Sequence, residues 1–229
     1  MGNNTHIIMP HSGYRKLIVY KKSEIIYQGT VVFCRRFLNA YKDRTIDQMI
    51  QAARSCKQNI AEGSAASGSS KETEIKLTNV ACATLDELLE DYNDYLNTHH
   101  ACKWPANDEK KLLARTFAVE HLEWKQWEHI FQSRNSEICC NLLIIIIYQT
   151  RFLLDRLIRR QENDFLDYGG IRERMFYARK NIKNSTLESI IISKLNMAQT
   201  QAELLATAQN IMAHVKNTVE TIRQNKHWQ

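Results

Sequence analysis

Three residues with metal-binding side chains lie close together in the sequence, at His99, His100 and Cys102. A zinc site needs three or four ligands at workable spacing, and the sequence offers no second cluster to complete this one. Histidine near the carboxyl end of a helix also interacts favourably with the helix dipole, which gives these residues a simpler role. We therefore predict no metal site and no cofactor.

Other patterns with catalytic potential are equally incomplete. The sequence has no Gly-x-Ser-x-Gly motif, and its Gly/Ser-rich stretch 63–70 lacks the lysine spacing of a phosphate-binding P-loop. A helix starting at Ser69 could hold an anion through its free N–H groups, although a plain turn is the simpler interpretation. Asn59 and Glu62 resemble an acid with its orienting partner, yet such groups also satisfy the last turn of a helix. We predict a non-catalytic protein.

The strongest functional signal is the distribution of positive charge. Residues 14–61 contain ten Lys and Arg against three Asp and Glu, and residues 134–183 contain ten against six. Residues 62–100 reverse the sign, with two basic and eight acidic side chains. Clustered Lys and Arg neutralise nucleic-acid phosphates. The candidate nucleic-acid-binding residues are Lys21, Lys22, Arg35, Arg36, Arg44, Arg54, Lys57, Arg156, Arg159, Arg160, Arg172 and Arg174.

Pairing within the protein is the alternative use of these cations. The acidic segment carries five carboxylates on a predicted third helix, at Asp86, Glu87, Glu90, Asp91 and Asp94. Neutralisation by these carboxylates and binding of RNA or DNA both remain open at this point. The sequence contains no groove-reading motif and no aromatic-interleaved basic platform, so any nucleic-acid binding would be independent of base sequence.

The elements that must position these residues are long helices. Only two prolines and seven glycines interrupt 229 residues, and 44% of the side chains are hydrophobic. Helical periodicity predicts a first helix over 14–41 and a second from residue 43 or 45 to a left-handed cap at Gly63. Ser69 and Glu72 then spell a capping box that opens a third helix ending near His99.

The remainder of the chain is predicted to hold an insertion, a fourth helix and an extension. Residues 101–133 form an inserted helical segment, and a largely apolar helix runs from Glu137 to about Phe165. Gly169 and Gly170 then break the chain. From Leu187 onward apolar residues recur at alternating spacings of four and three, the heptad pattern of a coiled coil. A single helix of about 36 residues there would be roughly 54 Å long.

The segment QMIQAARSCKQNIAEGSAASGSSKETEIKLTNVACATLDELLEDYNDYL resembles the four-helix-bundle proteins first described from intervening sequences in bacterial 23S ribosomal RNA genes. The matching positions include Asn59, Glu62 and Gly63, and the stretch with Gly169 and Gly170 is similar to the Gly-Gly-Ile-Arg-Glu suffix of one subgroup. The resemblance covers about 14–183. The heptad extension departs from the family pattern.

This resemblance implies an antiparallel up-down four-helix bundle. The family is similar in fold to the accessory variability protein of diversity-generating retroelements, which implies a homo-oligomer, specifically a pentamer. It also implies basic surfaces that bind nucleic acid beside a reverse transcriptase. The organisation expected for this chain is a loosely ordered tail over 1–13, a bundle with its suffix over 14–183, and a C-terminal helix over 184–229.

Cysteine usage and apolar runs indicate the compartment. The six cysteines form no Cys-x-x-Cys pair and are expected to be buried, reduced thiols. The N-terminus lacks an apolar segment of secretory length, and the longest apolar run, Leu142–Tyr148, is too short to cross a bilayer. We expect a cytoplasmic protein without a membrane partner.

The leading prediction is therefore an all-α, oligomeric, non-catalytic scaffold that binds RNA or DNA by charge, as an accessory to a larger nucleoprotein. The alternative is a protein-interaction module with no nucleic-acid role, in which the C-terminal helix docks a protein partner.

Overall fold

The computed structural model describes residues 13–39, 45–197 and 201–224, and every regular element in those ranges is a helix. The all-α prediction is confirmed. The described chain divides into two compact units, one ending at Arg172 and the other beginning at Glu173. The boundary therefore lies 11 residues before the one predicted at residue 184.

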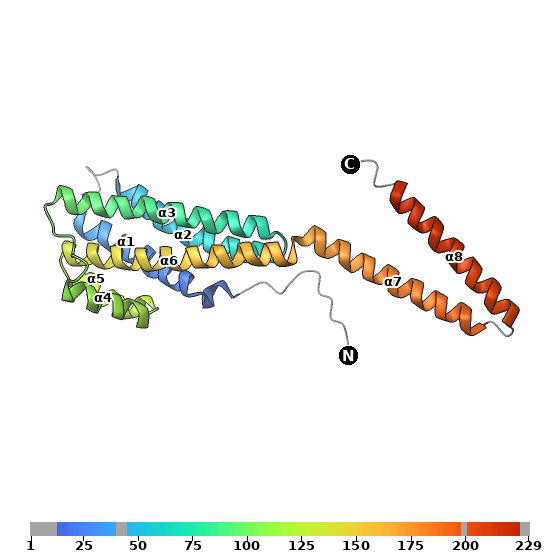
Figure 1. The fold of residues 1–229 in the computed structure, drawn as a ribbon. Helices are drawn as coiled ribbons and strands as arrows, with labels where there is room; N and C mark the ends of the chain where they lie inside the picture. The colour runs from blue at the N-terminus through green and yellow to red at the C-terminus, as the bar shows by residue number, and fades with distance from the viewer. Residues whose placement is uncertain (1–12, 40–44, 198–200, 225–229) are drawn as a thin grey trace. The chain divides into compact units, whose positions relative to one another are not determined.

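Four long helices surround the core of the first unit: α1 (Ile18–Phe37), α2 (Thr45–Ala66), α3 (Lys71–Thr98) and α6 (Ser136–Tyr168). Helices α1 and α3 each pack against both α2 and α6. Successive helices of the four run in opposite directions (Figure 1). Phe33, Leu88, Tyr92 and Leu143 are fully buried where these helices meet. Burial of such side chains contributes about 1.5–3 kcal/mol each.

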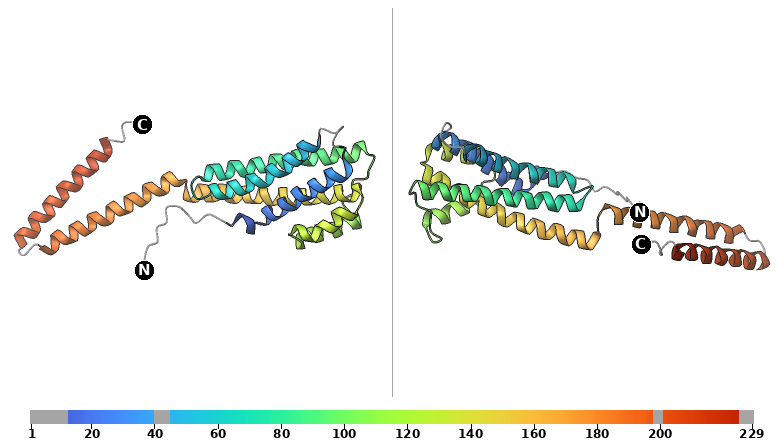
Figure 2. Two further views of the ribbon diagram at one scale, coloured as in Figure 1. Left: turned by 180° about the vertical axis from the view of Figure 1, so that it is seen from behind. Right: turned by 90° about the horizontal axis from the view of Figure 1, so that it is seen from above.

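The inserted segment forms two helices rather than one. After the short 3₁₀ turn η1 (Tyr14–Lys16) at the start of the unit, the additional helices are α4 (Glu109–Glu120) and α5 (Trp124–Ser133). Asp108 caps α4 by accepting a 2.8 Å hydrogen bond from the Lys110 N–H. Helix α4 packs against α6 and α5 against α1, outside the four-helix core (Figure 2).

The predicted end of the second helix is wrong. Helix α2 continues through Gly63 to Ala66, and Ser70 rather than Ser69 caps α3 by accepting a hydrogen bond from the Thr73 N–H. Gly63 is buried, and a methyl group there would lie 3.4 Å from the Glu74 carbonyl oxygen and the Leu77 Cβ. Gly63 therefore lies inside α2 against α3 and does not turn the chain.

The long C-terminal helix does not begin after residue 184, as the sequence predicted. Helix α7 (Ile171–Met197) runs without a break past residue 185, and α8 (Gln201–Gln224) is separate. The Ser185 hydroxyl donates back to the Ile182 carbonyl at 2.8 Å, as a residue inside a helix does. The expected break does occur at Gly169, whose φ of 65° is in the left-handed region. Ala198, which belongs to the predicted heptad pattern, lies outside the described residues.

One segment of the described chain, Ser136–Glu173, is long and apolar enough to cross a membrane by length and composition alone. Of its most apolar stretch, 61% is buried inside the protein. The six residues Leu142–Ile147 are all buried against neighbouring helices. A core helix covered on several sides needs this composition for packing.

Gly29 provides a test of core packing. A methyl group there would approach within 2.9 Å of Leu143 Cδ2 and 3.3 Å of Phe131 Cζ, both fully buried. Overpacking of this kind costs about 1–3 kcal/mol, which exceeds the gain of about 1 kcal/mol from alanine's helix propensity. We expect Gly29→Ala to lower the free energy of unfolding in urea by about 1 kcal/mol.

The matched control is Gly63→Ala, where the new methyl makes ordinary van der Waals contacts. It should leave stability unchanged or raise it by up to about 1 kcal/mol. Equal effects of the two substitutions would contradict this account of α1 packing.

Candidate nucleic-acid interface

Lys22 lies in the core and cannot take part in a surface patch. The prediction that it binds nucleic acid is therefore wrong. Its side chain is buried on α1, and Nζ donates to the Ala118 carbonyl of α4 and, at 2.8 Å, to Gln149 Oε1 of α6. Burial lowers the pKa of Lys22 to about 8, because a desolvated ammonium is costly. The lysine ties three helices together.

Two further predicted residues have structural contacts. Arg36 donates through Nη1 to the Phe131 carbonyl and, at 2.9 Å, to the Arg134 carbonyl, and so satisfies the end of α5. The Lys57 ammonium lies 4.5 Å from the centre of the Tyr27 ring, in a cation–π contact between α2 and α1. Both contacts hold neighbouring elements together.

The other predicted cations do not converge on one surface. Lys21 is half-buried and Arg35 exposed on α1, while Arg54 is exposed on α2. Helices α2 and α6 occupy different corners of the bundle, because each packs mainly on α1 and α3. The exposed residues of α6 therefore form a separate group: Arg156, Arg159 and Arg160.

Three predicted residues remain. Arg172 is exposed and lies near Glu72. The pKa of Glu72 is lowered first by Lys76, whose Nζ lies 2.8 Å from the carboxylate, and to a smaller extent by Arg172. Arg44 lies outside the described residues, and Arg174 lies on α7 with its side chain outside them.

The alternative of internal pairing holds for one cation that was not among the twelve candidates. Arg151 on α6 binds Asp86 of α3, with Nε 3.1 Å from Oδ1, and also binds Asp155 on its own helix. Among the described side chains, none of the twelve candidate cations makes an ion pair. Among the described candidates, the acidic third helix thus does not neutralise the cations through ion pairs.

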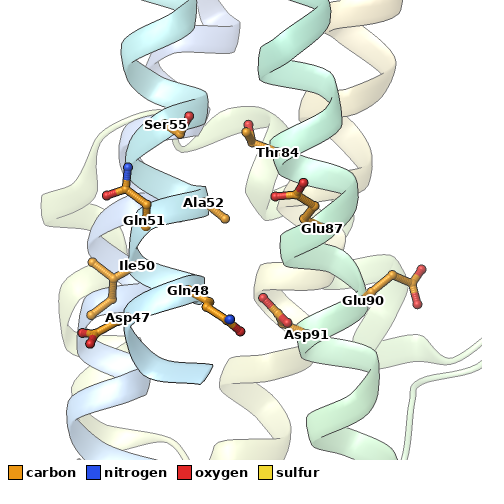
Figure 3. Close-up of a pocket in the computed structure, with 10 residues that line it drawn as sticks. All are labelled: Asp47, Gln48, Ile50, Gln51, Ala52, Ser55, Thr84, Glu87, Glu90 and Asp91. Atoms are coloured by element: carbon orange, nitrogen blue, oxygen red, sulfur yellow. The ribbon is translucent and has the colours of Figure 1, made fainter. Parts of the chain in front are cut away.

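Three carboxylates of α3 lie instead at an acidic groove between α2 and α3, of about 1060 Å³. Its acidic residues are Asp47, Glu87, Glu90 and Asp91, and no Lys or Arg lines it. Glu87 and Asp91 project from α3 toward α2 (Figure 3). Partial burial, followed by Asp94 and Glu87, raises the pKa of Asp91. The carboxylates of this groove repel phosphate.

The structure brings a different set of residues together along α6. Tyr148 and Phe152 are 48% and 60% exposed, and Arg156 and Arg159 follow at helical intervals on the same side. Lys103 Nζ lies 5.9 Å from the Tyr148 ring centre, and the Arg156 guanidinium carbon lies 5.9 Å from that of Phe152. Each exposed ring thus has a cation over it, in a cation–π contact.

Helix α4 forms the other wall of a groove of about 440 Å³ that includes both rings. Lys111 and Arg115 line that wall. Gln149 joins the walls, because its Nε2 donates to the Arg115 carbonyl at 3.0 Å while its Oε1 accepts from Lys22. We name this surface the α4–α6 face; it consists of Lys103, Lys111, Arg115, Tyr148, Phe152, Arg156 and Arg159.

The cations of this face retain their charge. Lys103 Nζ donates to Asn93 Oδ1 at 2.7 Å, and Lys111 Nζ donates to the Trp104 carbonyl at 3.0 Å. These neutral partners orient the ammonium groups without cancelling them. The nearby carboxylates Asp86 and Asp155 are both bound by Arg151. The face is therefore cationic at neutral pH.

Sequence reasoning missed most of the α4–α6 face. Segment 101–133 contains five basic and five acidic residues, so a search for excess charge passes over its lysines and Arg115. The spacing of Tyr148, Phe152 and Arg156 at four-residue intervals is the signal that indicates an aromatic and basic side of one helix. The statement that no aromatic-interleaved basic surface exists is corrected.

The described residues offer no suitable set of side chains for metal binding or for nucleophilic chemistry. His99 stacks on Tyr95 at 4.0 Å, and no group of three His, Cys, Asp or Glu in the described ranges is placed to hold a metal ion. Burial raises the pKa of the Cys82 and Cys139 thiols to about 11, which disfavours the nucleophilic thiolate.

No protein-family model, curated protein or solved structure matches the chain. The similarity to the four-helix-bundle family therefore stays a prediction. Function has to be inferred from the surfaces described above.

The buried lysine predicts a specific pH dependence. Below pH 8 the folded and unfolded states both hold the Lys22 proton, whereas between about pH 8 and 10.5 only the unfolded state does. Stability rises with pH wherever the unfolded state binds more protons. Relative to Lys22→Met, the wild-type protein should gain on the order of 1–2 kcal/mol over this interval.

Urea unfolding at several pH values measures this gain. Lys21→Met removes the same charge from a half-buried neighbour and is the control. A constant difference between wild type and Lys22→Met across the interval would mean that Lys22 is not desolvated.

Proposed function

We propose that this chain is a non-catalytic, oligomeric scaffold that binds nucleic acid without sequence specificity through the α4–α6 face. The observation that supports this is the gathering of five cations from three segments on the α4–α6 face, where Lys111 and Arg115 line the groove and none of the five is in an ion pair among the described side chains. Such cations attract phosphate by releasing its condensed counterions.

The distribution of charge favours binding of nucleic acid on one side of the bundle. The acidic groove between α2 and α3 lies on another side of the bundle from α4, since α4 packs on α6. Phosphates are therefore repelled from one side and attracted to the other. The face offers charged and aromatic groups but no helix shaped to enter a major groove, so backbone contacts dominate and base sequence is not read.

The proposal predicts loss of binding on removal of two cations. Arg115→Gln combined with Arg156→Gln should weaken the binding of a labelled oligonucleotide roughly ten-fold at about 50 mM salt. The slope of log affinity against log salt should fall by about 2, one unit for each lost phosphate contact. Fluorescence anisotropy over a salt series measures both quantities.

The matched control is Arg35→Gln combined with Arg54→Gln, which removes the same charge from exposed positions on α1 and α2. It should change the affinity less than three-fold, an effect of net charge alone. Equal loss in the two double variants would locate binding elsewhere, and no binding even at low salt would exclude the function.

The second unit supports a second candidate function, self-association as a protein-interaction module. Leu205, Met212, Val215 and Val219 on α8 are 45–74% exposed and follow the four–three spacing of a coiled-coil seam. Large apolar side chains in this pattern gain free energy by packing against another helix. Through this seam, copies of the chain would assemble and multiply the cationic face.

Self-association can be tested by charge insertion. Leu205→Asp with Val215→Asp should reduce the molar mass measured by light scattering, because two buried carboxylates on the seam are strongly unfavourable. Ala206→Asp with Asn217→Asp, which avoid the seam, should leave the mass unchanged. A wild-type protein that is monomeric at high concentration would contradict the oligomeric proposal.

A further inference from the structure

Phosphate binding alone does not account for the two aromatic rings of the α4–α6 face. Tyr148 and Phe152 are 48% and 60% exposed, while Ile147 and Leu154 on the same helix are fully buried. Exposure of two large rings one helical turn apart forfeits the free energy that their burial would provide. A ligand that covers ring faces recovers it.

We infer that the nucleic acid bound here is single-stranded and that its bases stack on Tyr148 and Phe152. This inference rests on the proposed function, and it names the class of ligand. Exposed aromatic rings beside cations are the combination that unpaired bases require, since every base has a stacking face and every nucleotide carries a phosphate.

The spacing of the rings favours a single strand. Residues four apart on a helix are separated by about 6 Å along its axis, whereas stacked bases in a duplex are about 3.4 Å apart. Two neighbouring bases that each cover one ring are therefore separated from one another. A paired, continuously stacked duplex presents its phosphates outward and cannot place base faces against rings on a rigid helix.

The cations are placed for the phosphates of such a strand. Lys103 lies 5.9 Å from the Tyr148 ring centre and Arg156 lies 5.9 Å from that of Phe152, so each ring is accompanied by its own charge. Lys111 and Arg115 line the opposite wall of the groove. A strand that runs along α6 thus meets a ring and a cation at each successive nucleotide.

The floor that holds the rings in place is well anchored. Gln149 lies between them in sequence and bonds to Lys22 of α1 at 2.8 Å and to the Arg115 carbonyl of α4 at 3.0 Å. Ile145 completes the apolar lining of the groove. A preorganised platform loses little entropy when a base covers it, which favours binding.

The test compares single-stranded and duplex DNA on the full-length protein. The probes are a labelled thymidine oligonucleotide of about 15 nucleotides and a labelled duplex of the same length. Tyr148→Leu with Phe152→Leu keeps apolar side chains at both positions but removes the ring faces. We expect affinity for the single strand to fall at least about ten-fold. Affinity for the duplex should change less than about two-fold, because phosphate contacts remain.

A matched rescue separates stacking from shape. Tyr148→Phe with Phe152→Tyr exchanges the two rings and should bind the single strand as the wild type does. Thermal melting of all variants verifies that the fold is retained, which the exposure of both side chains favours. The salt slope for the single strand should be unchanged in the leucine variant, because no cation is removed.

The outcomes distinguish this inference from the function on which it rests. Wild-type binding that is equal for both probes and insensitive to the leucine variant overturns the inference and leaves charge-driven binding intact. A parallel loss for both probes in the leucine variant also overturns it, because the rings would then support the face rather than the bases. Failure of both probes to bind the wild type, even at low salt, removes the proposed function itself.

Discussion

The structure depends on the covering of α6. Residues 142–147 of this helix are buried on every side, so one neighbouring helix cannot shield it. Helices α1 and α3 cover its inner sides, and the inserted α4 covers part of the outer side. The cover stops short at Tyr148 and Phe152, which remain exposed beside α4. The groove of the α4–α6 face exists because α4 shields only part of an apolar helix.

Buried polar contacts fix the position of α4 against α1 and α6. A buried lysine is costly unless its ammonium is hydrogen-bonded, and Lys22 meets this requirement by bonding to the Ala118 carbonyl and Gln149. The amide nitrogen of Gln149, Nε2, then donates to the Arg115 carbonyl. Core electrostatics on α1 thereby set the positions of the outer cations on α4, which connects folding energetics with the chemistry of the surface.

Charge is segregated around the bundle rather than cancelled. Three acidic side chains of α3, Glu87, Glu90 and Asp91, line the groove next to α2, whereas Asp86 is bound by Arg151. Surface ion pairs contribute only about 0–1 kcal/mol, so little stability is lost when most cations stay unpaired. The gain is a field with opposite signs on different sides of the molecule. Such a field suits a protein that attracts one charged polymer to one surface.

Composition, periodicity and the glycine pair at 169–170 determined a good deal by themselves: an all-α chain, the starts of most helices and the break after α6. These are local properties, set by backbone propensity and by one helix at a time. Local patterns misplaced the end of α2, because a glycine after a helical run is a common cap signal, whereas α2 continues through Gly63 to Ala66. The C-terminal helix was likewise predicted to begin after residue 184, although α7 already runs from Ile171 to Met197.

Only the tertiary structure decided which charges act together. In the folded chain Lys22 is buried in the core, and Arg36 is hydrogen-bonded to the end of α5. Lys103 and Arg115, from a segment with no net charge, lie next to the exposed rings of α6. Charge counting cannot reveal this, because the field at a surface depends on distances between residues far apart in sequence, and packing alone sets those distances.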